Sequence, residues 1–143
     1  NTKQLGERLT SWAGVHIKET KSATVRFGNV IESRGNVFEI WNEENKKGKP
    51  LSITDVTMKR YFIHIDKVDF ILNVLLKAKS GEIFIPKMEN FNIKKLADKI
   101  SKSQKIIGLR QGEKLEEVLL NMDEKNNAIE EKNMWIIKPY KCN

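Results

Sequence analysis

The sequence has few of the residues from which metal centres, disulfides and nucleophilic active sites are built. Its 143 residues include one cysteine, Cys142, and two histidines, His16 and His64. A single cysteine excludes a disulfide within the chain and favours a reducing compartment, so we expect the cytoplasm. The histidines and the cysteine are too scattered for a zinc site, and no Ser/His/Asp or Cys/His set stands out. We therefore expect no metal, and we expect His64, which alternates with Phe62, to pack against a sheet.

Long apolar runs and glycine-rich phosphate loops are also missing. No apolar stretch approaches the ~20 residues that span a bilayer, and no basic-then-apolar signal segment opens the chain. Without a Gly-x-Gly-x-x-Gly or Walker-type loop, the chain has no cradle of its own for a dinucleotide or a triphosphate. It starts at Asn1, and residues 2–12 already have a helical pattern, so we expect a fragment of a longer protein. Whether that parent carries membrane helices is left open.

Positive charge is in excess, with 26 Lys and Arg against 19 Asp and Glu and a net charge of +7. This balance implies attraction to a polyanion, which could be nucleic acid, acidic lipid or the diphosphate of a nucleotide. Several lysines are spaced among apolar residues, as on the solvent side of a helix: Lys94, Lys95, Lys99, Lys102 and Lys105. A plain solvated face and a nucleic-acid track both fit this spacing.

Strand-like and helical patterns alternate along the whole chain. Helices are predicted around residues 2–12, 37–41, 68–76, 93–100 and 115–119, and strands at 23–27, 51–54, 61–65, 82–85, 105–109 and, as a last edge strand, 134–137. Residues 123–132 are polar and are expected to be exposed. The alternation implies an α/β fold in which helices pack on a mixed sheet.

Two of these helices carry their apolar residues on one face. Leu5, Leu9 and Trp12 share a face of the first helix, which indicates a packed helix. The clearest helix follows Asp66, a candidate N-cap, and its apolar residues fall at i, i+3, i+4, i+7 and i+8. These residues are Val68, Ile71, Leu72, Leu75 and Leu76.

Four polar or basic residues occur near strand ends or helix starts: Asn29, Arg34, Arg60 and Arg110. The planar guanidinium of arginine meets phosphate oxygens in pairs, and the amides at a helix start add partial positive charge. A diphosphate would accept hydrogen bonds both from such arginines and from such helix-start amides. The residues alone equally allow ordinary surface arginines or salt-bridge partners.

Four segments then occur in an order that resembles a known family. They are V-R-F-G-N-V with S-R-G-N-V (25–37), T-D-x-x-M-K-R-Y-F (54–62), G-E-I-F-I-P-K (81–87) and I-G-L-R-Q-G-E-K-L (107–115). They resemble segments of UDP-N-acetylglucosamine 4,6-dehydratases and related capsular polysaccharide enzymes, which are extended short-chain dehydrogenase/reductases (SDRs). The resemblance implies an extended Rossmann-type SDR fold, of which this chain is the C-terminal part. Residues 1–34 would end the cofactor-binding domain, as the last Rossmann helix and strand, and residues 35–143 would form a small α/β sugar-nucleotide-binding subdomain.

The start of the chain is similar to the family's Y-G-A-T-K-x-x-x-E stretch, or to M-G-A-T-K in its membrane-associated branch. Lys3 would then be the lysine that binds the nicotinamide ribose of NAD or NADP, and Glu7 the acidic residue of the stretch. The resemblance also implies that this lysine lowers the pKa of a tyrosine four residues earlier, a position before Asn1.

The resemblance further implies a substrate site. Asn29 would contact the sugar nucleotide, Arg34 would shape the same region, and Arg60 and Arg110 would hold the diphosphate. Glu113 would accept hydrogen bonds from the uridine ribose hydroxyls, a task suited to a carboxylate with two free oxygens. A carboxylate that stabilises a helix start is the alternative for Glu113.

Five positions depart from the family's pattern: Phe27 for Tyr, Asn36 for Ser, Lys59 for Thr, Gln111 for Pro and Glu116 where His is frequent. None removes a charged ligand contact. Phe27 loses a hydroxyl, Gln111 loosens the loop that holds Arg110, and Lys59 adds charge beside Arg60. These departures put the particular sugar in doubt rather than the substrate class.

The function that the resemblance implies is an NAD(P)-dependent nucleotide-sugar 4,6-dehydratase, with or without C5 epimerisation, in surface polysaccharide biosynthesis. The parent enzyme would oxidise C4 of the hexose, eliminate water across C5 and C6, and return the hydride at C6. We expect this chain alone to be inactive, and to expose apolar surface that the rest of an oligomeric parent covers. The alternatives are a stand-alone sugar-nucleotide-binding module and a basic nucleic-acid-binding domain.

Overall fold

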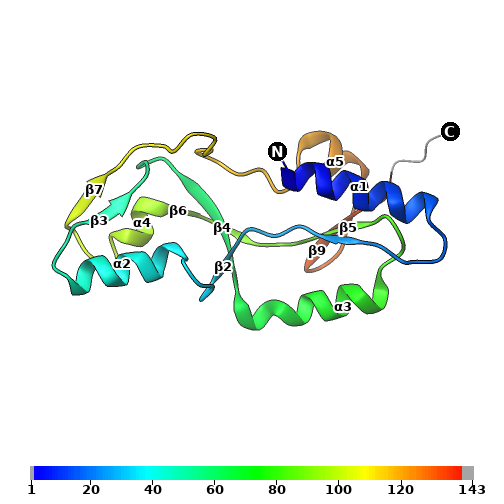
Figure 1. Cartoon of the computed structure of the whole chain (residues 1–143), viewed down its shortest axis with the longest axis horizontal. Coiled ribbons are helices and arrows are strands. Elements are labelled where there is room, and N and C mark those ends of the chain that lie inside the picture. Colours follow the sequence, from blue (N-terminus) through cyan, green and yellow to red (C-terminus); the bar gives the residue numbers. More distant parts are fainter. Residues whose placement is uncertain (1, 140–143) are drawn as a thin grey trace. The chain divides into compact units, whose positions relative to one another are not determined.

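A computed structural model describes residues 2–139, except for the side chain of Val68 (Figure 1). These residues form two compact units, each assembled from separate stretches of the chain. Unit 1 contains residues 2–27, 68–87 and 119–139, and unit 2 contains residues 28–67 and 88–118. The predicted boundary at residue 34 separates a cofactor-binding part from a sugar-nucleotide-binding part. These two roles remain a prediction.

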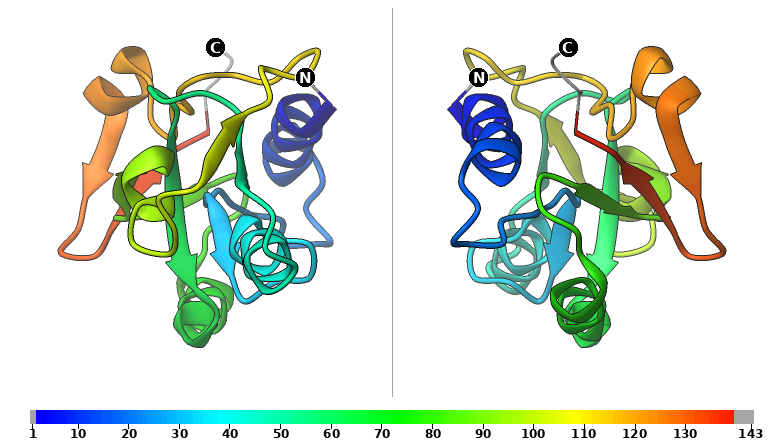
Figure 2. Two further views of the ribbon diagram at one scale, coloured as in Figure 1. Left: turned by 90° about the vertical axis from the view of Figure 1, so that its left-hand side faces the viewer. Right: turned by 90° about the vertical axis from the view of Figure 1, so that its right-hand side faces the viewer.

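Unit 1 is built on a four-stranded mixed sheet with the strand order β1-β5-β9-β8. Strand β1 runs parallel to β5, whereas β5, β9 and β8 are antiparallel neighbours. Figure 2 shows β8 in orange beside β9 in red. The elements are α1 (Thr2–His16), β1 (Thr24–Val25), α3 (Asp69–Lys77), β5 (Ile83–Pro86), α5 (Met122–Asn127), β8 (Ala128–Glu130) and β9 (Met134–Ile137).

Unit 2 contains a three-stranded sheet of order β2-β4-β6 and a two-stranded parallel sheet of β3 and β7. Strand β4 pairs in parallel with β2 and antiparallel with β6. The elements are β2 (Asn29–Ile31), α2 (Val37–Lys46), β3 (Leu51–Ile53), β4 (Lys59–His64), β6 (Glu89–Asn92), α4 (Ile93–Ala97) and β7 (Gln104–Ile106). A 3₁₀ helix, η1 (Ile65–Val68), follows β4.

Each unit has its own apolar core. In unit 1, Val74 and Ala78 pack against Phe84 and Met134 of the sheet. The larger core of unit 2 consists of Trp41, Leu51, Ile53, Met58, Phe62, Ile93 and Ala97. The indole Nε1 of Trp41 donates to the backbone oxygen of Ser52 at 2.7 Å, so its polar atom is satisfied while the ring is buried.

The predicted α/β class is confirmed, and the structure shows how two of its helices begin. Asn92 caps α4, because its side chain accepts a hydrogen bond from the amide of Lys95 at 2.9 Å. Asn36 caps α2 in the same way, by accepting from the amides of Phe38 and Glu39. These caps explain why two polar loops give way to helices at those points.

Other predictions about secondary structure were wrong. No helix forms at residues 115–119, where Val118 is 68% exposed and the backbone instead bonds to β4. The polar stretch 123–132 is mostly exposed, as predicted, but it also holds α5 and β8, which were not predicted; a capping box between Asn121 and Glu124 starts α5. Strand β9 is not an edge, since β5 and β8 flank it. Strands β2 and β6 were not predicted, because each is short and follows a glycine or a proline-containing turn.

Burial also differs from the expected pattern. Leu5, Leu9 and Trp12 are each more than half exposed, so the expected packed face of α1 is wrong for the described residues. On α3, Leu75 and Leu76 are 74% and 83% exposed, and the helix buries a different face that includes Val74. Exposed apolar surface was expected for this chain, and the structure shows it on both helices.

Two polar predictions also need correction. His64 is exposed at the end of β4, and its Nδ1 lies 2.9 Å from Oδ1 of Asp66 rather than against a sheet. The lysine-bearing helix ends at Ala97, so Lys99, Lys102 and Lys105 lie beyond it. Asp98 ends this helix, and its carboxylate accepts hydrogen bonds from Lys94 and Gln104.

Candidate functional site

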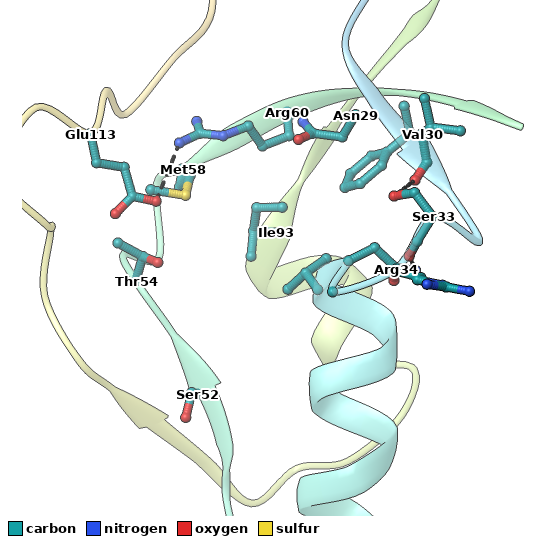
Figure 3. A pocket seen from close by; sticks show the side chains of 14 residues that line it. Asn29, Val30, Ser33, Arg34, Ser52, Thr54, Met58, Arg60, Ile93 and Glu113 are labelled. Carbon is teal, nitrogen blue, oxygen red and sulfur yellow. Dashed lines mark hydrogen bonds and ion pairs between the residues drawn. The ribbon is translucent and has the colours of Figure 1, made fainter.

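Unit 2 contains a pocket of about 290 Å³. Its apolar floor is made by residues of the core, among them Phe62. Figure 3 shows two others, Met58 and Ile93. Its polar wall comes from β2 and the loop after it, from β3 and β4, and from the segment that follows β7. The polar side chains of this wall are Asn29, Ser33, Arg34, Asn36, Ser52, Thr54, Arg60 and Glu113.

Asn29 is placed by a close approach of two strands. It opens β2 and pairs with Phe62 of β4, and its Nδ2 donates to the backbone oxygen of Tyr61 at 3.3 Å. A Cβ on the preceding residue, Gly28, would lie 2.4 Å from the same Tyr61 oxygen. Glycine is therefore needed at position 28 for β2 to reach β4 and for Asn29 to enter the pocket wall.

The loop between β2 and α2 forms the next part of the wall. Ser33 Oγ donates to the backbone oxygen of Val30 at 2.8 Å, and Gly35 has a φ of +71° that favours glycine. Arg34 lies between them. Figure 3 shows its guanidinium pointing away from Arg60 and Glu113, so Arg34 lines the pocket mainly with its backbone and stem in this structure.

Arg60 lies on β4 and its side chain is only 11% exposed. Its Nη1 donates to the backbone oxygens of Lys59 and Leu115 at 2.8 and 3.1 Å, and its Nη2 donates to that of Lys114 at 2.7 Å. Two carboxylates lie 3.7 Å from the same guanidinium, those of Glu113 and Glu117. Figure 3 shows Arg60 and Glu113 pointing toward each other at one end of the pocket.

Glu113 is positioned by a tight turn. The amide of Glu113 donates to the backbone oxygen of Arg110 at 3.0 Å, and Gly112, the third residue of the turn, has a φ of +81°. This is a type II turn, which requires a positive φ at its third residue. The amide of Arg110 donates in return to Oε2 of Glu113 at 3.1 Å. The predicted polar loop is therefore confirmed, whereas Glu113 starts no helix.

A second carboxylate close to the pocket, Asp55, supports the turn that leads into β4. Its Oδ1 accepts from Oγ1 and from the amide of Thr57 at 2.6 and 2.7 Å. These hydrogen bonds hold the pKa of Asp55 below its ordinary value. The amide of Met58 donates to the backbone oxygen of Asp55, which fixes Met58 in the pocket floor.

The structure brings four of the predicted site residues to one pocket: Asn29, Arg34, Arg60 and Glu113. Arg110 is exposed and does not line this pocket, although its backbone holds the Glu113 carboxylate. Lys3 belongs to α1 in unit 1. The ligand contacts assigned to these six residues remain predictions.

Sequence reasoning missed several residues of the wall. Thr54 had a signal, because it begins the T-D-x-x-M segment that resembles the family. Ser52 lies in no recognised motif, and only the pairing of β3 with β7 decides which way this strand residue faces. Two departures from the family's pattern also meet, because Lys59 Nζ lies 3.4 Å from Oε1 of Glu116.

Within residues 2–139, no helix is long and apolar enough to cross a membrane. In the same described part, no three His, Cys, Asp or Glu side chains gather as metal ligands would.

The fold and the motif residues of the pocket are those of the C-terminal part of an extended short-chain dehydrogenase/reductase. The sequence pattern of the family described as polysaccharide biosynthesis protein matches residues 1–139, so the chain belongs to this family.

Individual relatives agree with this membership. An uncharacterized membrane protein of Methanocaldococcus jannaschii is 38% identical over 97% of this chain and 46% of its own length. A UDP-N-acetylglucosamine 4,6-dehydratase (inverting) of Campylobacter jejuni is 39% identical over 85% of this chain and 38% of its own length. The X-ray structure of Pen from Bacillus thuringiensis matches with a TM-score of 0.88 and 32% identity, over 96% of this chain and 46% of that one. The chain thus spans less than half the length of each.

Proposed function

We propose that this chain supplies the UDP-sugar-binding pocket of an NAD(P)-dependent nucleotide-sugar 4,6-dehydratase that acts in surface polysaccharide biosynthesis, with or without inversion at C5. The observation that carries the proposal is the shared pocket. Asn29, Arg60 and Glu113 come from three separate stretches of sequence, and all three line the same cavity. The likeness to a dehydratase named for UDP-N-acetylglucosamine supports the substrate class.

Each side chain has a role in this proposal that suits its chemistry. Glu113 accepts hydrogen bonds from the ribose hydroxyls, since an ionised carboxylate is an acceptor only. Arg60 and Arg110 meet the diphosphate through charge-assisted hydrogen bonds. Asn29 both donates and accepts, which suits the hydroxyls of the hexose. Arg34 shapes the pocket beside them.

The cofactor is NAD or NADP in this proposal, and the chain's own contribution to it is small. Its sequence contains no glycine-rich dinucleotide loop, so the residue that we assign to the nicotinamide ribose is Lys3. We therefore expect the 143-residue chain to show no turnover with cofactor and UDP-N-acetylglucosamine. Detection of a 4-keto-6-deoxy product by mass spectrometry would refute this expectation.

Binding is the direct test of the pocket. Titration of the chain with UDP and with UDP-N-acetylglucosamine, followed by calorimetry or by amide NMR shifts, should show saturable binding with shifts at Asn29, Arg60 and Glu113. Glu113→Gln should weaken UDP binding about tenfold, since it removes a charged hydrogen-bond acceptor. The matched control is Glu43→Gln on α2, because Glu43 is exposed and pairs with Lys47 outside the pocket.

Two results of these titrations would contradict the proposal. Absence of binding by both nucleotides at millimolar concentration would remove the assignment of a UDP-sugar site. Binding that is lost equally in the Glu43 and Glu113 variants would place the ligand elsewhere on the chain.

A stand-alone sugar-nucleotide-binding module is the second candidate. The two functions differ in what the intact gene encodes. A Rossmann fingerprint upstream of Asn1 supports the enzyme, and its absence supports a module that binds UDP-sugars without chemistry.

A further inference from the structure

The segment that carries Glu113 is held to unit 2 without apolar burial. We define the return segment as residues 107–118, which lead back from β7 to the side of β4. Every residue of this segment is exposed except Glu113 and Glu117. Its apolar side chains, such as Leu109 and Val118, are at least 48% exposed apart from Leu115 at 41%. The segment is therefore fixed by polar contacts.

Several of those polar contacts converge on Arg60. The amide of Lys59 donates to the backbone oxygen of Leu115, and the Arg60 guanidinium donates to that oxygen and to the backbone oxygen of Lys114. Glu113 and Glu117, the two less exposed residues of the segment, place their carboxylates 3.7 Å from the same guanidinium. Arg60 thus holds the return segment from both sides.

The guanidinium has five N–H groups in a fixed fork, and here the chain's own oxygens surround it. Its Nη1 meets two backbone oxygens, Nη2 meets a backbone oxygen and Glu113, and Nε faces Glu117. A diphosphate that binds Arg60 must therefore take the place of one of these partners. The exchangeable partners are the carboxylates, because each is an anion at ion-pair distance rather than at hydrogen-bond distance.

We propose that Glu117 is an internal competitor of the ligand. In the absence of ligand, the Glu117 carboxylate occupies the face of Arg60 that a nucleoside diphosphate needs. Binding of the diphosphate displaces Glu117, whereas Glu113 stays in the pocket wall, where the ribose would meet it. This inference rests on the proposed function, because it takes the diphosphate to be the ligand of Arg60.

Glu117 is the exchangeable partner for two reasons. Its side chain is 41% exposed, so water replaces Arg60 easily when the pair breaks. Glu113 is less exposed, at 28%, and the amide of Arg110 also holds it in place. Gly108 and Gly112 both have a φ of +81°, a conformation that favours glycine. The backbone therefore turns sharply on either side of Arg110.

The test compares two neighbouring carboxylates. Glu117→Gln removes the competing charge and should tighten UDP binding about two- to fivefold, the range that an exposed ion pair supplies. Glu116→Gln is the matched control, since Glu116 pairs with Lys59 and not with Arg60. In an Arg60→Lys background, Glu117→Gln should give no further gain. Unchanged or weaker UDP binding by Glu117→Gln would overturn the proposal.

A second measurement separates this inference from the proposed function. Hydrogen exchange at the Lys59 and Glu113 amides should become faster when inorganic pyrophosphate is added, because displacement of Glu117 loosens the return segment. Glu43→Gln should leave this response intact, and Arg60→Lys should reduce it. If UDP fails to bind the wild-type chain, the proposed function fails. If UDP binds the wild-type chain but pyrophosphate leaves the exchange unchanged, only the displacement of Glu117 fails.

Discussion

Arg26 and Glu124 form a two-pronged ion pair across 98 residues of sequence. Nη1 and Nη2 of Arg26 each donate to one carboxylate oxygen of Glu124 at 2.8 Å. The Nε of Arg26 donates to Oε2 of Glu7 at 2.9 Å, and Nη1 donates to the backbone oxygen of Leu119. This cluster joins the end of β1 to α1 and α5, and each of its three side chains is less than one fifth exposed.

Removal of the Glu124 charge should destabilise unit 1. Glu124→Gln keeps the shape of the side chain but leaves Arg26 with a weaker partner, so we expect a loss of about 2 kcal/mol in the free energy of unfolding. Urea denaturation followed by circular dichroism measures this. Glu131→Gln, at an exposed carboxylate of the same unit, should change stability by less than about 0.5 kcal/mol. Equal losses in both variants would contradict a special role for the pair.

The same pair predicts a pH dependence. Burial raises the pKa of Glu124, but hydrogen bonds from Arg26 and from the Asn121 amide outweigh burial and hold the pKa below its ordinary value. A carboxyl that loses its proton more readily in the folded state stabilises the fold above its ordinary pKa. This contribution is lost as the pH falls through the lowered pKa. Unfolding free energies of wild type and Glu124→Gln should therefore differ at pH 7, and the difference should shrink as the pH falls below the ordinary glutamate pKa of about 4.3. A constant difference down to pH 3 would contradict this.

Because Gly14 of α1 lies close to Gly81, we expect Gly14 and the other glycine of α1, Gly6, to respond differently to replacement by alanine. A Cβ on Gly14 would lie 2.2 Å from the backbone nitrogen of Gly81 and 2.5 Å from its Cα, which are atoms that cannot rotate away. Gly14→Ala should therefore cost about 3 kcal/mol of stability.

Gly6 on the same helix is the matched control, because a Cβ there meets nothing within 4 Å. Gly6→Ala should stabilise the chain by up to about 1 kcal/mol through helix propensity. Thermal unfolding of both variants is the measurement, and similar midpoints would show that α1 does not pack against Gly81 in solution.

Gln111 offers a stabilising change at the site. It is the second residue of the type II turn from Arg110 to Glu113, and proline has the φ that this position requires. Gln111→Pro should raise stability by about 0.4–1 kcal/mol by restricting the unfolded chain. Hydrogen exchange at the Glu113 amide should also become slower. Gln111→Ala is the control and should do neither. Loss of stability in the proline variant would show that the turn has another geometry.

Local signals account for the parts of the fold and the site that could be predicted. The cap at Asn92 and the turn glycine at Gly112 act through neighbouring backbone groups, so a short stretch of sequence is enough to read them. The resemblance to the family selected Asn29, Arg60 and Glu113 in the same way, from motifs of a few residues. The structure then placed all three in one pocket.

Periodicity was less informative about burial. The spacing on α3 correctly groups Leu72, Leu75 and Leu76 on one face, but spacing does not say what that face meets. In the described residues this face is exposed, and Val74 on another face joins the core. At residues 115–119 the apolar spacing was misleading, since carbonyls of that stretch bond to β4 instead of forming a helix.

The sequence by itself determined the α/β alternation, the tight turn before Glu113 and the family to which the chain belongs, because each depends on residues that are close neighbours along the chain. The tertiary structure alone decided that Arg60 is surrounded by carbonyls and carboxylates of the return segment, and that Arg110 stays outside the pocket. These outcomes depend on which distant segments meet, and the free energy of such contacts is set by burial and geometry that no local pattern records.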